Sequence, residues 1–257
     1  MSLMTDFVDK FPISDGDTIL FSSDVIRLGY WFHQNHEKLD LNVFLDLLVE
    51  KVGKKGTIML PTYNWDFCGG KTFDYKHTLS KTGAISQAAL AHPSFKRTKH
   101  PLYSWAVAGK DRDFLCSLEN TDSFDCMSPF HYLYEKKGKN IILDVSLQNC
   151  FTFVHFVEEN VGVPYRYKKN FTADYIDENE KKTRRTYSMF VRDYDLDAEV
   201  NLDPLENYLI ENGTISIVSV GLSRILSVPL DAAFEAIKDD ILHNNAKKIA
   251  TYKGQYD

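Results

Sequence analysis

Short apolar runs alternate with longer segments of helical periodicity along this chain. The runs at 17–22 (DTILFS), 56–60 (GTIML) and 141–145 (IILDV) are typical of strands buried in a sheet. Residues 41–52 (LNVFLDLLVEKV) repeat apolar side chains every three or four positions, which predicts a helix with Asp40 as its N-cap. A strand, a helix and a strand of these lengths predict a parallel βαβ unit.

The alternation continues through the rest of the chain. Helices are predicted at 83–91 with Ser80 or Thr82 as the cap, from Pro129, at 203–212 and at 229–242, and strands at about 103–108 and 214–221. Residues 165–195 alternate polar and aromatic side chains around a charged Asp177-Glu178-Asn179 turn, which predicts a β-hairpin. We therefore expect an α/β fold whose central, mostly parallel sheet is flanked by helices, with a small antiparallel β excursion near 165–195. Since no Pro/Gly/Ser-rich linker interrupts the chain, we expect a single domain over residues 1–257.

Composition excludes several classes of protein. The 257 residues carry a net charge of −6, whereas a general nucleic-acid binder would normally be basic. No run of 18 apolar residues predicts a membrane span, and the N-terminus has neither the basic start nor the apolar core of a signal peptide. The four cysteines form no C-x-x-C pair, so we expect no metal site or disulfide framework, but free thiols in a reducing cytoplasm.

The strongest candidate chemistry follows the run at 141–145. Thr152, His155, Glu158 and Glu159 recur at spacings of three and four, so they share one face of a predicted helix. A histidine over a carboxylate, just past a core strand, is a candidate acid–base pair. The alternative is a core histidine beside surface glutamates.

Other polar groups gather around loops. Ser22 and Ser23 end the first strand, where they cap a helix or contact a ligand. The long loop at 62–83 combines aromatic residues with Asp66, which suits a sugar carrying an amine, although a packed loop with capping aspartates is equally compatible. Lys81, at a helix start, and Arg97, in the basic cluster at 96–100, are candidates for binding phosphate rather than forming a solvated face.

Seven segments occur in the order of motifs found in the aminoglycoside 3-N-acetyltransferase family, which the chain resembles from about residue 10 to 243. They are GDTILFSSD (16–24), LPTYNWDF (60–67), SKTG (80–83), RTKHPLYS (97–104), SPFHYLYE (128–135), TFVHFVEE (152–159) and VGLSRIL (220–226). One departure stands directly before the histidine. The family usually has G-V-G and a short loop with Asn-Thr there, whereas this chain has DVSLQNCFT at 144–152.

The resemblance implies transfer of an acetyl group from acetyl-CoA to an amine of an amino sugar, without a metal. It implies His155 as the general base and Glu158 as the residue that orients it. It places CoA against Ser22, Ser23, Lys81, Thr82, Arg97 and Ser104, and the acceptor against Asp66, Glu159 and Thr152. Attack is expected to be direct, because no activated cysteine is evident.

Other functions remain open at this point. The acceptor is either an antibiotic or an amino sugar destined for a surface polysaccharide. The basic residues of the predicted hairpin are also compatible with a nucleotide-linked acceptor. A Ser/His hydrolase would need a G-x-S-x-G elbow, which does not occur. A catalytically silent acetyl-CoA-binding protein is the remaining alternative, and assembly as a homodimer stays open.

Overall fold

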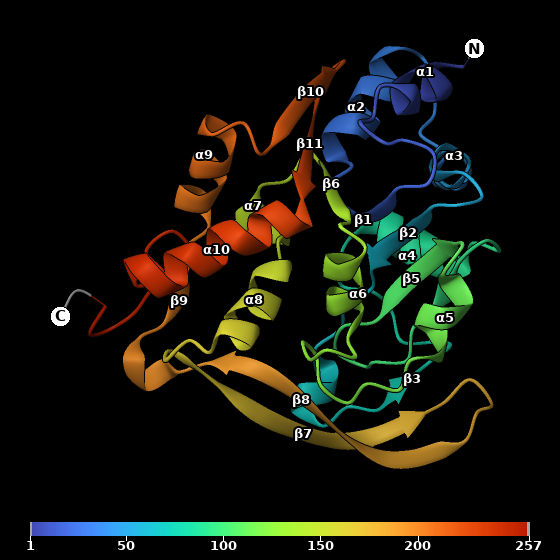
Figure 1. Cartoon of the computed structure of the whole chain (residues 1–257). Helices are drawn as coiled ribbons and strands as arrows, with labels where there is room; N and C mark the ends of the chain where they lie inside the picture. The colour runs from blue at the N-terminus through green and yellow to red at the C-terminus, as the bar shows by residue number, and fades with distance from the viewer. Residues whose placement is uncertain (1, 256–257) are drawn as a thin grey trace.

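The computed structural model describes residues 2–255, and their main feature is a seven-stranded sheet (Figure 1). The strand order is β10 (Ser216–Val220), β11 (Ser223–Pro229), β6 (Lys139–Leu143), β1 (Thr18–Ser23), β2 (Thr57–Pro61), β5 (Trp105–Gly109) and β4 (Lys96–Arg97). The expected α/β fold with a central sheet is confirmed. Parallel pairing joins the three middle strands, β6, β1 and β2, whereas the flanking pairs are antiparallel.

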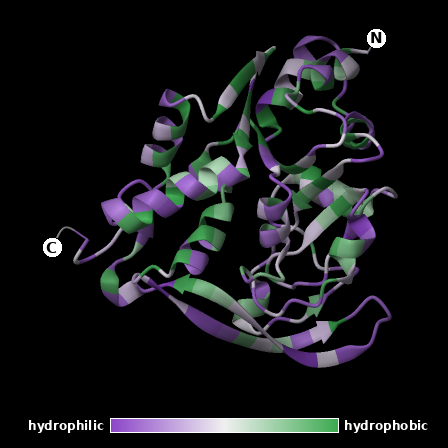
Figure 2. Cartoon of the chain, viewed as in Figure 1, coloured by the Kyte–Doolittle hydropathy of each residue, from purple (hydrophilic) through white to green (hydrophobic). Residues whose placement is uncertain are grey.

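Helices cover both faces of this sheet because its strands alternate two sets of apolar side chains. On β1, Ile19 and Phe21 face one layer and Leu20 faces the other. The first layer contains α1 (Leu3–Asp9), α2 (Ile26–Gln34), α3 (Leu41–Val52) and α4 (Ala84–Ala91). The second contains α5 (Arg112–Ser117), α6 (Pro129–Glu135), α8 (Phe153–Val161), α9 (Asp203–Glu211) and α10 (Leu230–Asn244). Figure 2 shows much of β10 and β11 in green, and long purple stretches in the hairpin at the opposite end of the molecule.

A long hairpin crosses one end of the molecule (Figure 1). Strands β7 (Arg166–Ile176) and β8 (Lys182–Arg192) pair antiparallel over their whole length, and short β3 (Phe73–Asp74) joins β7 in parallel. Asp177 closes the turn by accepting hydrogen bonds from the backbone N–H groups of Asn179 and Lys181. The predicted antiparallel excursion is therefore confirmed, and it ties the 62–83 loop to the segment after α8.

Two helix starts illustrate where local prediction succeeds and fails. Asp40 caps α3 as predicted, because its carboxylate accepts from the N–H groups of Asn42 and Val43. The predicted Ser80 or Thr82 cap of α4 is wrong. Gly83 occupies the N-cap position at φ 102°, and no side chain caps the helix. Helices α1 and α2 were not predicted, and α2 also begins without a side-chain cap at its N-cap residue, Val25.

None of the helices formed by residues 2–255 combines the length and apolar character needed to cross a bilayer. The remaining elements are short: the 3₁₀ helices Asp66–Gly69 and Tyr194–Leu196, α7 (Leu147–Cys150), and the paired strands β9 (Glu199–Val200) and β12 (Ala250–Thr251).

Candidate active site

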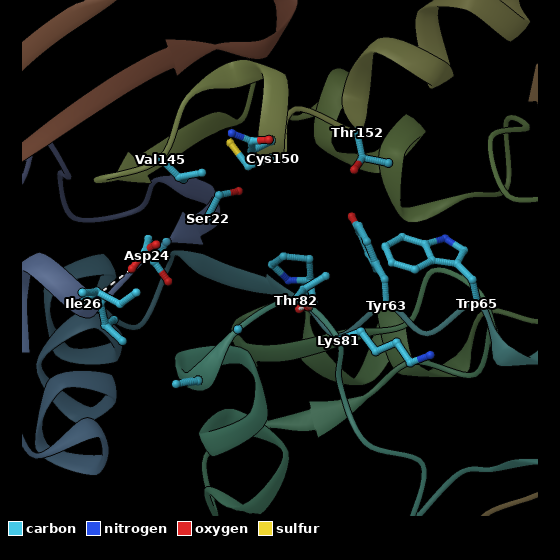
Figure 3. Close-up of a pocket in the computed structure, with 16 residues that line it drawn as sticks. Ser22, Asp24, Ile26, Tyr63, Trp65, Lys81, Thr82, Val145, Cys150 and Thr152 are labelled. Carbon is cyan, nitrogen blue, oxygen red and sulfur yellow. Dashed lines mark hydrogen bonds between the residues drawn. The ribbon is translucent and has the colours of Figure 1, made fainter. Parts of the chain in front are cut away.

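The carboxyl ends of β1, β2 and β6 converge on a pocket of about 480 Å³ (Figure 3). Because these strands are parallel, the segments that follow them meet at one edge of the sheet, where α/β proteins usually bind ligands. The lining comes from the end of β1, the segment after β2, the start of α4 and the segment after β6: residues 22–26, Pro61, Tyr63, Trp65, residues 81–84, Val145, Asn149, Cys150 and Thr152.

Several of the predicted cofactor residues line this pocket. Ser22, Ser23, Lys81 and Thr82 all contribute to its wall. The Ser22 hydroxyl donates to Asn140 Oδ1 at 3.2 Å, and the Thr82 hydroxyl donates to the carbonyl oxygen of Pro61. These bonds fix the ends of β1 and β2 and the approach to α4, so the uncapped first turn of α4 stands at the pocket wall. Backbone N–H groups in such a position favour an anion.

Arg97 and Ser104 lie elsewhere. Both are buried, and Arg97 Nε donates to Ser104 Oγ at 3.0 Å. The Arg97 guanidinium also donates to the Thr78 carbonyl at 2.5 Å and stands 4.8 Å from the Phe73 ring centre. Burial lowers the pKa of Arg97 to about 10. These two residues brace the long loop from inside, and neither lines the pocket.

The predicted acid–base pair forms on α8. Phe153, Phe156 and their apolar neighbours pack into the core, which leaves His155 partly exposed and draws Glu158 fully inside. His155 Nδ1 lies 2.6 Å from Glu158 Oε2, and Arg166 Nε lies 2.7 Å from the same oxygen. Arg166, at the start of β7, therefore completes a three-residue chain that runs from the hairpin to the imidazole.

Burial and neighbouring charges set the protonation states of His155 and Glu158. Burial lowers the pKa of His155, and the nearby Arg166 charge lowers it further, against the opposing effect of Glu158. Burial alone would raise the pKa of Glu158, but His155 and Arg166 together bring it below its usual value. An ionised Glu158 accepts a hydrogen bond from the N–H at Nδ1 of His155. The neutral imidazole therefore carries its free lone pair on Nε2. That is the form of histidine that accepts a proton.

His155 and the main pocket meet at the segment before α8. Thr152 lines the main pocket and also a smaller hollow of about 90 Å³, which His155 lines together with Val154 and residues 148–151. The backbone N–H of His155 donates to the Thr152 carbonyl at 3.0 Å. Asn149 and Cys150 also line both cavities, so the altered DVSLQNCFT segment forms the boundary that they share.

The predicted acceptor residues do not gather in one place. Asp66 lies 2.6 Å from Lys81 Nζ and 3.3 Å from Lys71 Nζ, and it lines a separate hollow. Glu159 lies one residue beyond Glu158, and its carboxylate is 2.8 Å from Lys168 Nζ. Of the three residues assigned to the acceptor, Thr152 and Glu159 therefore stand on the α8 segment that carries His155, whereas Asp66 is held in ion pairs on the 62–83 loop.

Sequence reasoning missed one contributor to the site, Arg166. Arg166 follows α8 in the segment GVPYR, whose position directly after the histidine motif was the available signal. Cys150 lies in the pocket wall, where its thiol donates to the Ser146 carbonyl at 3.2 Å and burial raises its pKa to about 12. A protonated thiol is a poor nucleophile. Among residues 2–255, no three His, Cys, Asp or Glu side chains are grouped to hold a metal ion.

Comparisons with known proteins agree with this architecture. The family model described as aminoglycoside 3-N-acetyltransferase matches residues 22–241, while no curated protein sequence gives a significant match. Similar solved structures include AAC-IIIb in a binary complex with CoASH, at 17% identity and a TM-score of 0.76 over 94% of this chain and 95% of that one. Sisomicin-bound AAC-VIa is 16% identical, with a TM-score of 0.77 over 94% of this chain and 97% of that one. YokD from Bacillus subtilis is 18% identical, with a TM-score of 0.75 over 95% of this chain and 93% of that one.

At these identities the solved structures establish a shared fold. The family match, in contrast, covers both the β1 end of the pocket and the His155–Glu158 helix. Most of the central sheet and its helices lie within the same range. The chain therefore belongs to the aminoglycoside 3-N-acetyltransferase family of acyltransferases.

Proposed function

We propose that this protein transfers the acetyl group of acetyl-CoA directly to an amine of an amino sugar, with His155 as the general base. The observation that carries the proposal is a neutral imidazole fixed by a fully buried carboxylate beside the main pocket. Glu158 orients this imidazole, and Arg166 holds Glu158 in its ionised form.

The chemistry follows from that arrangement. The lone pair of the acceptor nitrogen attacks the thioester carbonyl while His155 Nε2 removes a proton from the nitrogen. The C–N bond forms, the C–S bond breaks, and CoA leaves as a thiolate that takes up a proton. Glu158 stabilises the transient imidazolium. A base in this position contributes about 10²–10⁴-fold to the rate.

The main pocket suits the acetyl-CoA side of the reaction. Ser22, Ser23 and Thr82 line it, and the uncapped N-terminus of α4 with nearby Lys81 favours phosphate groups. Figure 3 shows Thr152 and Tyr63 pointing toward one another across this cavity. We propose that the Thr152 hydroxyl donates a hydrogen bond to the thioester oxygen as negative charge develops there, because Thr152 lines both the main pocket and the hollow that contains His155. The CoASH complex of AAC-IIIb supports the choice of co-substrate.

Direct transfer is preferred over a covalent acetyl-enzyme. Cys150 is the thiol in the pocket wall, and burial holds its pKa at about 12. An attacking thiolate would require deprotonation well above neutral pH. The amine itself is therefore the nucleophile.

A pair of histidine variants tests the proposal. His155→Gln removes the base, and CoA release in the presence of glucosamine or sisomicin is expected to fall by about 10²–10⁴-fold. Binding of acetyl-CoA, measured by calorimetry, is expected to persist. His243→Gln is the matched control, because His243 Nδ1 lies 3.0 Å from the Asp239 carboxylate but is exposed on α10. Near-normal turnover in His155→Gln would overturn the assignment.

A further inference from the structure

A lysine of the hairpin is inserted between two carboxylates near the proposed base. Lys168 Nζ, on β7, lies 2.6 Å from Asp122 Oδ2 and 2.8 Å from Glu159 Oε1. The two carboxylate side chains are only 11% and 12% exposed, whereas the lysine side chain is half exposed. Ser188, on β8, donates to the same oxygen of Asp122 at 2.6 Å. Both hairpin strands thus converge on this acidic pair.

The pair borders the position where the acceptor must approach. Glu159 follows His155 by four residues, so both side chains lie on the same face of α8. Phe124, two residues after Asp122, has its ring centre 6.0 Å from that of the His155 imidazole. An acceptor whose amine reaches His155 therefore places its neighbouring groups close to Asp122 and Glu159.

Lys168 changes what this surface can recognise. Two carboxylates without a partner would attract the additional ammonium groups of a polycationic aminoglycoside. Here one internal ammonium already neutralises one of the two negative charges and bonds to both acids. Burial and the nearby Asp122 also raise the pKa of Glu159. At most one negative charge is left for the substrate.

We propose that Lys168 is a specificity-determining residue that occupies the place of a second substrate ammonium. The protein then prefers an amino sugar with one free amine to a polycationic aminoglycoside. This inference rests on the proposed N-acetyltransferase function and narrows its acceptor class. The alternative is that Lys168 only clamps the hairpin to α8, in which case its removal lowers activity toward every acceptor alike.

The test compares two acceptors in four proteins. The ratio of kcat/KM for sisomicin, a polyamine, to kcat/KM for glucosamine, a monoamine, is measured in the wild type and in Lys168→Met, Lys168→Arg and Lys169→Met. Lys168→Met is expected to raise this ratio about tenfold or more, because the acidic pair becomes free to bind a substrate ammonium. Lys168→Arg keeps the charge, and Lys169→Met changes the neighbouring lysine of the same strand. Both are expected to keep the ratio within about twofold of the wild type.

The outcomes separate the inference from the function on which it rests. An unchanged ratio in a folded Lys168→Met protein that still binds acetyl-CoA would overturn the role of Lys168 and leave the acetyltransferase assignment intact. A wild type that acetylates neither amine, although it binds acetyl-CoA, would overturn the proposed function and this inference with it. If Lys168→Met does not fold, Lys168→Gln carries the same comparison, because its amide still hydrogen-bonds to the carboxylates without the charge.

Discussion

Replacing Arg166 by methionine perturbs the proposed base without touching it. Arg166 and Glu158 are 4% and 0% exposed in their side chains, and their contact is 2.7 Å. Removal of one member of such a buried pair costs about 3–5 kcal/mol of folding free energy. The variant can recover part of this cost by protonating His155, because an imidazolium then replaces the guanidinium as the partner of Glu158.

The size of the resulting pKa change follows from the geometry. Arg166 Nε and His155 Nδ1 contact the same carboxylate oxygen at 2.7 and 2.6 Å, so these nitrogens lie within about 5 Å of each other. Two positive charges at that separation repel by about 3 kcal/mol at an effective dielectric constant of about 20. Loss of Arg166 is therefore expected to raise the pKa of His155 by about two units. At any given pH, a larger share of His155 would then be protonated and unable to act as the base.

The assay is kcat/KM as a function of pH for the wild type, Arg166→Met and Arg166→Lys with one acceptor. The titration of the substrate amine is common to all three enzymes, so differences between the profiles come from the protein. The acid limb of Arg166→Met is expected to move to higher pH, with activity recovering as pH rises. Arg166→Lys keeps a positive charge and is expected to leave the limb in place. A uniform loss at every pH, with the limb unmoved, would refute the electrostatic role of Arg166.

Three further substitutions test separate parts of the account. Cys150→Ser is expected to keep a rate of acetyl transfer within a few fold of the wild type. Intact-mass measurement of the wild type during turnover should show no acetylated protein, and an acetyl group trapped on Cys150 would contradict direct attack. Burial lowers the pKa of His100 to about 3, whereas the unfolded value is about 6.5. Between these two values only the unfolded state takes up the proton, so stability should fall by up to about 1.4 kcal/mol for each unit by which the pH is lowered. His100→Asn should show a shallower acid dependence in denaturant titrations, and an equal slope would argue against a neutral buried imidazole. Gly83→Ala places a β-carbon on a residue with a φ of 102°, which should lower the free energy of unfolding by about 1 kcal/mol or more. The variant should also bind acetyl-CoA more weakly, because Gly83 lies at the start of α4, and an unchanged affinity would argue against α4 as part of the cofactor site.

Local patterns in the sequence identified the parts of the fold that depend on local spacing. The apolar period of residues 41–52 predicted α3 and its cap, because helix faces and capping groups are set by near neighbours. The alternation through 165–195 likewise predicted the hairpin. His155 and Glu158 could be paired from sequence because a separation of three residues brings side chains together on any helix.

Contacts between distant segments could not be read in this way. Arg97 belongs to a cluster of basic residues in the sequence, but in the structure Arg97 turns inward to bond loop carbonyls while Lys96 beside it is exposed. Arg166 reaches Glu158 only because the chain turns back after α8 into β7. Charge clustering along a chain does not report burial, and the partner of a buried carboxylate is chosen by tertiary packing.

Single-turnover transfer from preformed enzyme–acetyl-CoA complexes tests the central claim most directly. The complex of the wild type, and separately that of His155→Gln, is mixed with an excess of amino sugar, and free CoA and N-acetylated sugar are quantified over time. The account predicts that the two products appear together at one rate in the wild type, while His155→Gln keeps acetyl-CoA bound and forms about 10²–10⁴-fold less product in the same interval. CoA released before the amine is added, or product formed at the wild-type rate by His155→Gln, would contradict direct transfer with His155 as the base.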